Sequence, residues 1–170
     1  MERPSPELQK EVLDDNARKF ITEPLNADFL SQHGAVSYVL TTDWLETDES
    51  SEKKVVCKRY DDGNIQRLLI TKVTKDGTRT SEKEKITEDE YDELLEHSLI
   101  HVEKRRAEFG YEQNGIVFEV KYDEFAASDL RILEVDAATD EQRQSFDPIG
   151  GSHEVTGDMG YYGYRVAQQI

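Results

Sequence analysis

Three short turns that contain glycine each separate two runs of β-forming residues, and this pattern limits the possible folds more than any other feature. Asn-Gly and Asp-Gly pairs favour tight hairpin turns, because both central positions of such a turn need a positive φ. Each turn therefore predicts two antiparallel strands that are neighbours along the chain. The turns are Asp62-Gly63, Asp76-Gly77 and Asn114-Gly115.

Eight strands are predicted in total, with helices between or beside them. A capping box formed by Thr87 and Glu90 predicts a helix over residues 87–97. Further short helices are predicted over residues 5–15, which begin with Ser-Pro, and over residues 139–146. Together these elements predict an α+β fold with a large antiparallel sheet. The predicted strands are 17–22, 36–43, 55–60, 65–73, 78–86, 99–109, 115–125 and 130–137.

The charge of the chain restricts its partners. The formal net charge is −16, and such a field repels nucleic acid and anionic membranes at long range. We therefore expect neither as a partner. The only cysteine, Cys57, allows no intrachain disulfide, and no apolar run approaches the length of a membrane span. These features predict a cytoplasmic protein, and they leave the oligomeric state open.

Charged residues alternate with apolar residues along several predicted strands. In the segment FEVKY, Phe118 and Val120 share one face, while Glu119 and Lys121 share the other. One interpretation is an ordinary sheet with one solvated face. The other is a closed sheet whose inner face is charged, which is costly unless the charges are paired or meet a charged ligand. Mixed carboxylates and cations of this kind suit a complex of a divalent metal with polyphosphate.

Sequence motifs resemble those of the CYTH family, the triphosphate tunnel metalloenzymes. Residues 148–168, PIGGSHEVTGDMGYYGYRVAQ, resemble its C-terminal signature, in which Glu-Val-Thr-Gly-Asp precedes an aromatic-rich segment. LITK at 69–72 resembles Leu-Thr-x-Lys, EKEKI at 82–86 resembles Glu-x-Glu-x-x-Ile, and KRR at 104–106 fits Lys-x-Arg. The resemblance spans about residues 15–168.

The resemblance implies a closed eight-stranded antiparallel β-barrel, or tunnel, with a few flanking helices. It implies one domain over residues 1–170, with a helical extension over residues 1–14. The implied function is metal-dependent hydrolysis of a triphosphate compound, such as inorganic triphosphate, with Mg²⁺ or Mn²⁺ as cofactor. The implied site residues are Lys19, Glu134 and Asp136 for catalysis, Arg59, Lys72, Lys104 and Arg106 for phosphate binding, and Asp15, Glu82, Glu84, Glu119, Glu134, Asp136 and Glu154 for metal binding.

The chain departs from the family pattern in its first-strand motif. Where the family has Glu-x-Glu-x-Lys, residues 15–19 read DNARK, so Ala17 replaces a metal-binding glutamate. Lys121 also stands where an aspartate is common. The sequence therefore leaves a second function open, a catalytically impaired module that binds polyphosphate or nucleotide without turnover. A third possibility is a domain that serves only a structural or partner-binding role.

Overall fold

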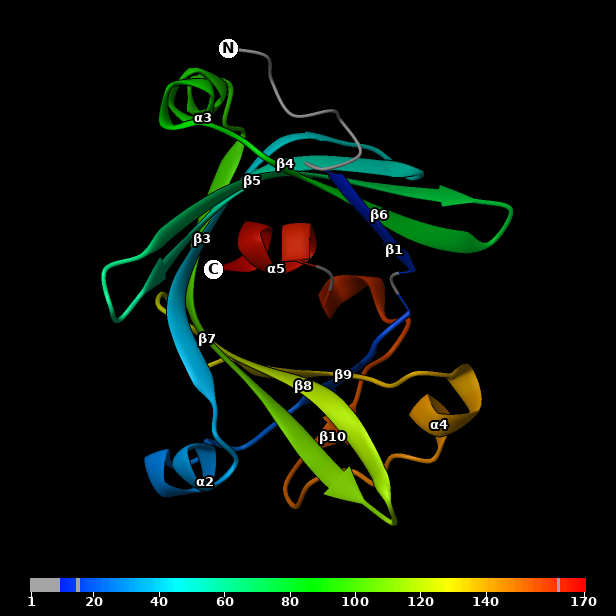
Figure 1. Cartoon of the computed structure of the whole chain (residues 1–170). Coiled ribbons are helices and arrows are strands. Elements are labelled where there is room, and N and C mark those ends of the chain that lie inside the picture. The colour runs from blue at the N-terminus through cyan, green and yellow to red at the C-terminus, as the bar shows by residue number, and fades with distance from the viewer. Residues whose placement is uncertain (1–9, 15, 162) are drawn as a thin grey trace. The chain divides into compact units, whose positions relative to one another are not determined.

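The structure is a computed structural model that describes residues 10–14, 16–161 and 163–170. It is an α+β protein, as predicted, in which strands dominate and the helices are short (Figure 1). The strands are β1 Lys10–Asp14, β2 Arg18–Ile21, β3 Val36–Thr47, β4 Ser51–Tyr60, β5 Ile65–Lys75, β6 Thr78–Lys85, β7 Ile100–Gln113, β8 Ile116–Phe125, β9 Arg131–Asp136 and β10 His153–Glu154. The helices are α2 Ala27–Gln32, α3 Glu88–Leu95, α4 Asp140–Gln144, the 3₁₀ turn η1 Met159–Tyr161 and α5 Gly163–Gln169.

The sheet is open, so the predicted closed eight-stranded barrel is wrong. Hydrogen bonds join the described strands in the order β1-β6-β5-β4-β3-β7-β8-β9-β2-β10, with β1 and β10 at the two ends. Closure would need the end strands to pair with each other along their length. Strand β10 has only two residues, both of which pair with β2, and it follows Pro148, Gly150 and Gly151, which favour turns over a longer strand.

The chain divides into two compact units. Unit 1 contains Met1–Asp15 and Leu40–Val102, and unit 2 contains Asn16–Val39 and Glu103–Ile170. Strands β3 and β7 each have residues in both units. That the chain forms one domain remains a prediction.

In unit 1, helix α3 covers one face of the sheet. Tyr91 of α3 packs with Val55 and Cys57 of β4 and with Leu45 of β3. The helix begins as predicted, because the Thr87 hydroxyl accepts a hydrogen bond from the backbone N–H of Glu90. Residues on the opposite face of β4, β5 and β6 therefore point away from α3.

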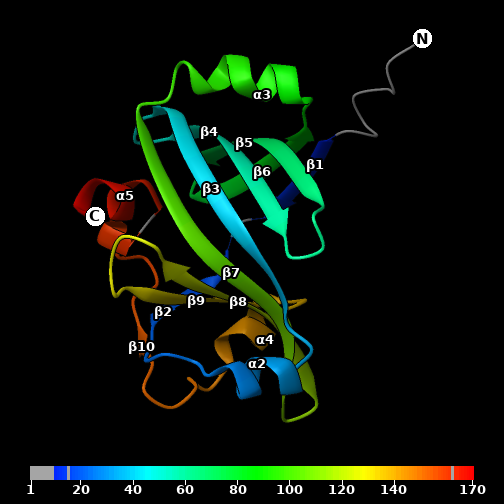
Figure 2. The same cartoon turned by 90° about the vertical axis from the view of Figure 1, so that its left-hand side faces the viewer.

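In unit 2, the sheet of β7, β8, β9 and β2 buries an aromatic core on one face. Phe20, Phe118 and Leu133 are fully buried in this core. Helices α2 and α4 lie on this side of the sheet (Figure 2), where Phe29 of α2 and Phe146, which follows α4, pack against the core. The other face carries the charged residues of the strands.

The local predictions were largely correct. The turn before β8 has positive φ at Asn114 and Gly115, as a tight hairpin turn requires. Residues 10–14 form β1 instead of the predicted helical extension, whose remaining residues 1–9 lie outside the described part of the chain. Helices α2 and α5 and strand β10 were not predicted. Within the described residues, no helix is long and apolar enough to span a membrane.

Candidate functional site

The charged face of unit 2 follows from strict alternation along three strands. On β8, Phe118, Val120 and Tyr122 enter the core, so Lys121 and Asp123 lie on the opposite face. The other two strands behave in the same way, since β7 and β9 also send alternate side chains into the core. The remaining charged side chains on this face are Lys104, Arg106 and Glu108 of β7, Glu119 of β8, and Glu134 and Asp136 of β9.

The strand register places opposite charges side by side. Glu108 lies opposite Lys121, Lys121 lies opposite Glu134, and Glu134 lies opposite Lys19 of β2. This makes one row of alternating charge across four strands. Directly opposed residues of antiparallel strands have Cβ atoms about 5 Å apart, close enough for their charges to interact. The predicted residues Lys19 and Glu134 are therefore brought together.

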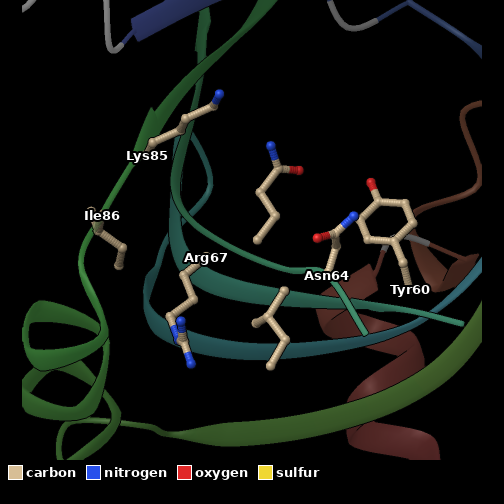
Figure 3. A pocket seen from close by; sticks show the side chains of 7 residues that line it. Tyr60, Asn64, Arg67, Lys85 and Ile86 are labelled. Atoms are coloured by element: carbon tan, nitrogen blue, oxygen red, sulfur yellow. The ribbon is translucent and has the colours of Figure 1, made fainter. Parts of the chain in front are cut away.

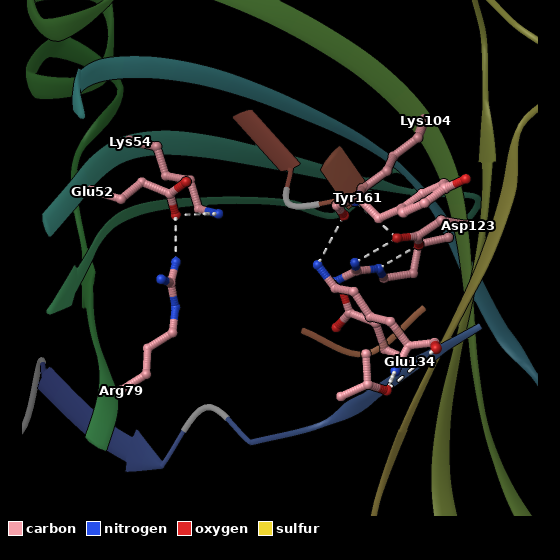
Figure 4. Close-up of polar contacts among 10 residues, drawn as sticks. Glu52, Lys54, Arg79, Lys104, Asp123, Glu134 and Tyr161 are labelled. Atoms are coloured by element: carbon pink, nitrogen blue, oxygen red, sulfur yellow. Dashed lines mark hydrogen bonds and ion pairs between the residues drawn. The ribbon is translucent and has the colours of Figure 1, made fainter. Parts of the chain in front are cut away.

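Asp123 is the centre of a second charged group (Figure 4). Its carboxylate accepts hydrogen bonds from Arg106 Nε at 2.6 Å and from Arg106 Nη2 at 2.7 Å. Lys104 Nζ lies 2.8 Å from Asp123 Oδ2. Asp123 is 1% exposed, so both cations owe their fixed positions to a carboxylate that solvent does not reach.

Burial and neighbouring charges change the pKa values of these groups. Burial raises the pKa of Glu134, but the positive charges of Lys19, Arg106, Lys104 and Lys121 outweigh it and hold the pKa well below its usual value. Burial lowers the pKa of Lys104, and the negative charge of Asp123 only partly opposes this. Glu134 is thus ionised at neutral pH and is a weak base.

Lys19 is held from two sides. Its Nζ lies 3.9 Å from Glu134 Oε1 and donates a hydrogen bond to the carbonyl of Tyr161 at 3.2 Å. Tyr161 belongs to the aromatic-rich segment after residues 154–158, which forms η1 and α5. The C-terminal motif therefore contributes a backbone oxygen to the charged face.

Glu154 lies away from this face and has a structural role. Its carboxylate accepts hydrogen bonds from Arg18 Nε at 2.7 Å and from Arg18 Nη2 at 2.8 Å. Arg18 Nη1 also donates to the carbonyls of Arg143 and Phe146. The hydrogen bond from Arg18 lowers the pKa of Glu154 to about 2. Arg18 shares a face of β2 with Phe20 of the core, opposite to Lys19.

The predicted metal ligands of unit 2 do not assemble into a metal site. Arg143 Nη1 lies 3.0 Å from Asp136 Oδ1, and Arg18 binds Glu154. Four positively charged side chains act on Glu134. Glu119 lies opposite Asp136 but is exposed. Among the described residues, no group of three or more His, Cys, Asp or Glu side chains could hold a metal ion. The predicted ligand Asp15 lies outside the described residues.

Unit 1 separates the other predicted residues onto two faces. Lys72 of β5 lies opposite Glu52 of β4, on the face away from α3. Glu82 and Glu84 of β6 lie opposite Thr71 and Leu69, and Leu69 packs in the core under α3, so both glutamates are on the other face. Arg59 shares that face with Cys57 and is exposed. Lys72 is therefore not placed with Glu82, Glu84 or Arg59.

Unit 1 also has a pocket of about 420 Å³ at the end of the β4–β5 hairpin (Figure 3). Its lining includes Tyr60, Asn64, Arg67 and Lys85. Arg67 Nη2 lies 3.9 Å from the carboxylate of Glu88, so that cation already has an acidic neighbour. None of the predicted site residues that the structure describes lines this pocket.

Sequence reasoning missed two carboxylates that organise cations. Asp123 could have been found from the sequence, because it continues the charged alternation of Glu119 and Lys121 on β8. Glu52 of β4 could not, because residues 46–54 read as a polar loop. In the structure, Glu52 is buried and contacts Trp44, Lys54 and Arg79.

Comparison with known proteins identifies the fold. The sequence matches no protein-family model and no curated protein. Two solved structures of the protein NE1496 match it, one described as an inorganic triphosphatase. The structure described as an inorganic triphosphatase has a TM-score of 0.59 and 21% identity, and the match covers 91% of this chain and 94% of its own. The second structure has a TM-score of 0.58 and 22% identity, and the match covers 91% of this chain and 97% of its own. PH1819 from Pyrococcus horikoshii OT3 matches with a TM-score of 0.50 and 14% identity over 75% of this chain and 82% of its own. The chain therefore has the fold of the inorganic triphosphatase NE1496, and the resemblance indicated by the sequence motifs agrees with this fold.

Proposed function

We propose that this protein binds a triphosphate compound and hydrolyses it on the charged face of unit 2. The observation that carries the proposal is the arrangement around Asp123 and Glu134. Four cations, Lys19, Lys104, Arg106 and Lys121, act on Glu134 there, and the buried carboxylate of Asp123 fixes two of them, Lys104 and Arg106. Cations held in fixed positions suit phosphate oxygens, and the inorganic triphosphatase NE1496 has the same fold.

Each residue has a role that follows from its chemistry. Arg106 and Lys104 neutralise the charge that develops on the transferred phosphoryl group. Glu134 orients the attacking water by a hydrogen bond. Because a carboxylate with so low a pKa is a poor proton acceptor, the proton of the water passes to an oxygen of the transferred phosphate as the bond to the leaving phosphate breaks. Lys19 adds positive charge beside Glu134. Asp136 is bound by Arg143, so we assign it no step.

In this proposal, Mg²⁺ or Mn²⁺ is required because it binds the triphosphate substrate. Triphosphate binds divalent cations in water, and a bound ion would reduce the charge that the site must neutralise. Among the described residues, no group of carboxylates fits a resident metal ion, and arginine or lysine side chains bind or surround Asp136, Glu154 and Glu134. We therefore derive no catalytic step through a protein-bound metal.

The pairing of site carboxylates with arginine favours a second candidate function, binding of polyphosphate or nucleotide without turnover. Ala17 removes a carboxylate that the family motif places on the first strand, and Arg143 and Arg18 engage two of the remaining carboxylates. In this case the cations of unit 2 would bind phosphate as in the first proposal, and only hydrolysis would be missing.

Phosphate release from inorganic triphosphate tests hydrolysis directly, with Mg²⁺, with Mn²⁺ and with chelator alone. We expect metal-dependent release, and we expect Arg106→Met to lower kcat/KM about 100-fold. Arg105→Met is the matched control, because Arg105 is exposed on the other face of β7, and it should retain activity. No release with either metal from neutral to alkaline pH would reject hydrolysis. Calorimetric binding of triphosphate would then support the module without turnover, and its absence would reject both.

A further inference from the structure

A second group of cations lies on the face of unit 1 that points away from α3. Glu52 of β4 lies opposite Lys72 of β5, and Lys72 lies opposite Ser81 of β6. The next row of the same face contains Lys54 of β4 and Lys83 of β6, which both lie opposite Ile70. These side chains therefore share one surface of three adjacent strands.

Glu52 holds part of this group in place (Figure 4). Its carboxylate accepts a hydrogen bond from Trp44 Nε1 at 2.8 Å, and it lies 3.3 Å from Lys54 Nζ and 3.6 Å from Arg79 Nη2. Burial raises the pKa of Glu52, but the charges of Lys54, Lys72 and Arg79 and the hydrogen bond from Trp44 outweigh it and lower the pKa. Glu52 is 8% exposed and fully engaged, so it fixes cations and is not available to bind a metal ion.

The hydroxyl of Ser81 is the feature that points to a ligand. Ser81 is 4% exposed, and its Oγ has no hydrogen-bond partner among the residues that the structure describes. A buried hydroxyl without a partner costs free energy, and such groups are few in folded proteins. This hydroxyl lies on the same face as Lys72, two residues from Arg79 and two from Lys83. An oxyanion bound beside these cations would accept its hydrogen bond.

We propose that Ser81, Lys72, Lys54 and Arg79 form a phosphate subsite in unit 1, in which the Ser81 hydroxyl donates to a phosphate oxygen. The proposal rests on the proposed function, since it assigns a phosphate of the same class of substrate to a second set of residues. The subsite needs no metal ion, because its carboxylate is already neutralised by cations and its donors are ammonium, guanidinium and hydroxyl groups. Binding of triphosphate at this subsite is therefore independent of divalent metal.

The test measures binding of sodium triphosphate to the full chain by calorimetry in the presence of EDTA. We expect the wild type to bind, and we expect Ser81→Ala to weaken binding about tenfold, the value of one hydrogen bond to a charged group. Lys72→Met should weaken it at least as much. The unfolding free energy without ligand should not fall in Ser81→Ala, because the replaced hydroxyl makes no hydrogen bond within the described residues.

Two variants on the opposite face serve as controls. Thr80 precedes Ser81 on β6, and Lys53 lies opposite Thr71, so both point toward the α3 side. Thr80→Ala and Lys53→Met should bind triphosphate as the wild type does. If Ser81→Ala and Lys72→Met match these controls, or if the wild type binds only with Mg²⁺ or Mn²⁺, the subsite is rejected while the proposed function stands. If the wild type binds under neither condition, both proposals fail.

Discussion

Replacement of Asp123 by asparagine should destabilise the protein more than any other single change of charge in unit 2. Asp123 is 1% exposed, accepts two hydrogen bonds from Arg106 and lies 2.8 Å from Lys104. Asparagine has nearly the same shape but no charge. The variant therefore leaves two cations, whose side chains are only 13% and 12% exposed, without their carboxylate, which costs about 3–5 kcal/mol of unfolding free energy. A domain of this size has only about 5–15 kcal/mol in total, so the loss should be plain.

Urea denaturation followed by far-ultraviolet circular dichroism measures this loss, and thermal denaturation should show a fall in Tm of roughly 6–20 °C. Glu124→Gln is the matched control, because Glu124 is the next residue on β8 and its ion pair with Arg131, at 3.6 Å, is half exposed. That variant should lose at most about 1 kcal/mol. A loss in Asp123→Asn no greater than in Glu124→Gln would refute the view that Asp123 organises the cations.

The difference in unfolding free energy between the wild type and Asp123→Asn depends on pH through the pKa of Asp123. Burial raises this pKa, but Arg106 and Lys104 outweigh it, so the folded-state pKa lies below the usual value of 3.8. A depressed carboxyl pKa contributes stability that is present above the unfolded-state pKa and is lost as the pH falls through the folded-state pKa. The difference between wild type and Asp123→Asn should therefore be the same at pH 7 and at pH 5. A difference that shrinks between these values would show that Asp123 is not held ionised.

Three further predictions concern the support of the site. Because Arg18 lowers the pKa of Glu154 from 4.5 to about 2, Glu154→Gln should lose about 1 kcal/mol at pH 7 after allowance for solvent screening, and this loss should vanish as the pH falls from 4.5 to 2 in urea titrations. Gly151→Ala should lower Tm, because Gly151 has φ +81° and an added Cβ would lie 2.9 Å from Cγ of Glu23; an unchanged Tm would contradict the turn geometry. Phe118→Ala should cost about 3–5 kcal/mol in urea denaturation, since Phe118 is fully buried and contacts the ring of Phe146; a cost below about 1 kcal/mol would mean that this core is loosely packed.

Local features of the fold were predictable because they depend on near neighbours. The turn at Asn114-Gly115 needs only two residues that tolerate positive φ, and the start of α3 needs only Thr87 and Glu90. Strand β1 was mistaken for a helix because its apolar spacing is compatible with a short amphipathic helix. Its pairing with β6, which is distant in sequence, decides the strand.

The candidate site was predictable only in part. Alternation placed Lys104 and Arg106 on one face of β7, and Glu134 and Lys19 then met across β9 and β2. Alternation could not show which carboxylates were already engaged. Arg143 reaches Asp136 from helix α4, and Arg18 reaches Glu154 over 136 residues of sequence.

The sequence by itself determined strands β2 to β9 in outline, their hairpin turns and which side chains of a strand share a face, because these depend on residue type and on a period of two along each strand. Tertiary structure alone decided that the sheet stays open, because closure depends on whether the two end strands pair. It also decided that Glu82 and Glu84 lie on the opposite face from Lys72, because the register between β5 and β6 fixes which residues stand opposite one another. Finally, the register of the β5–β6 hairpin placed Ser81 opposite Lys72, and the packing around Ser81 left its hydroxyl without a hydrogen-bond partner among the described residues.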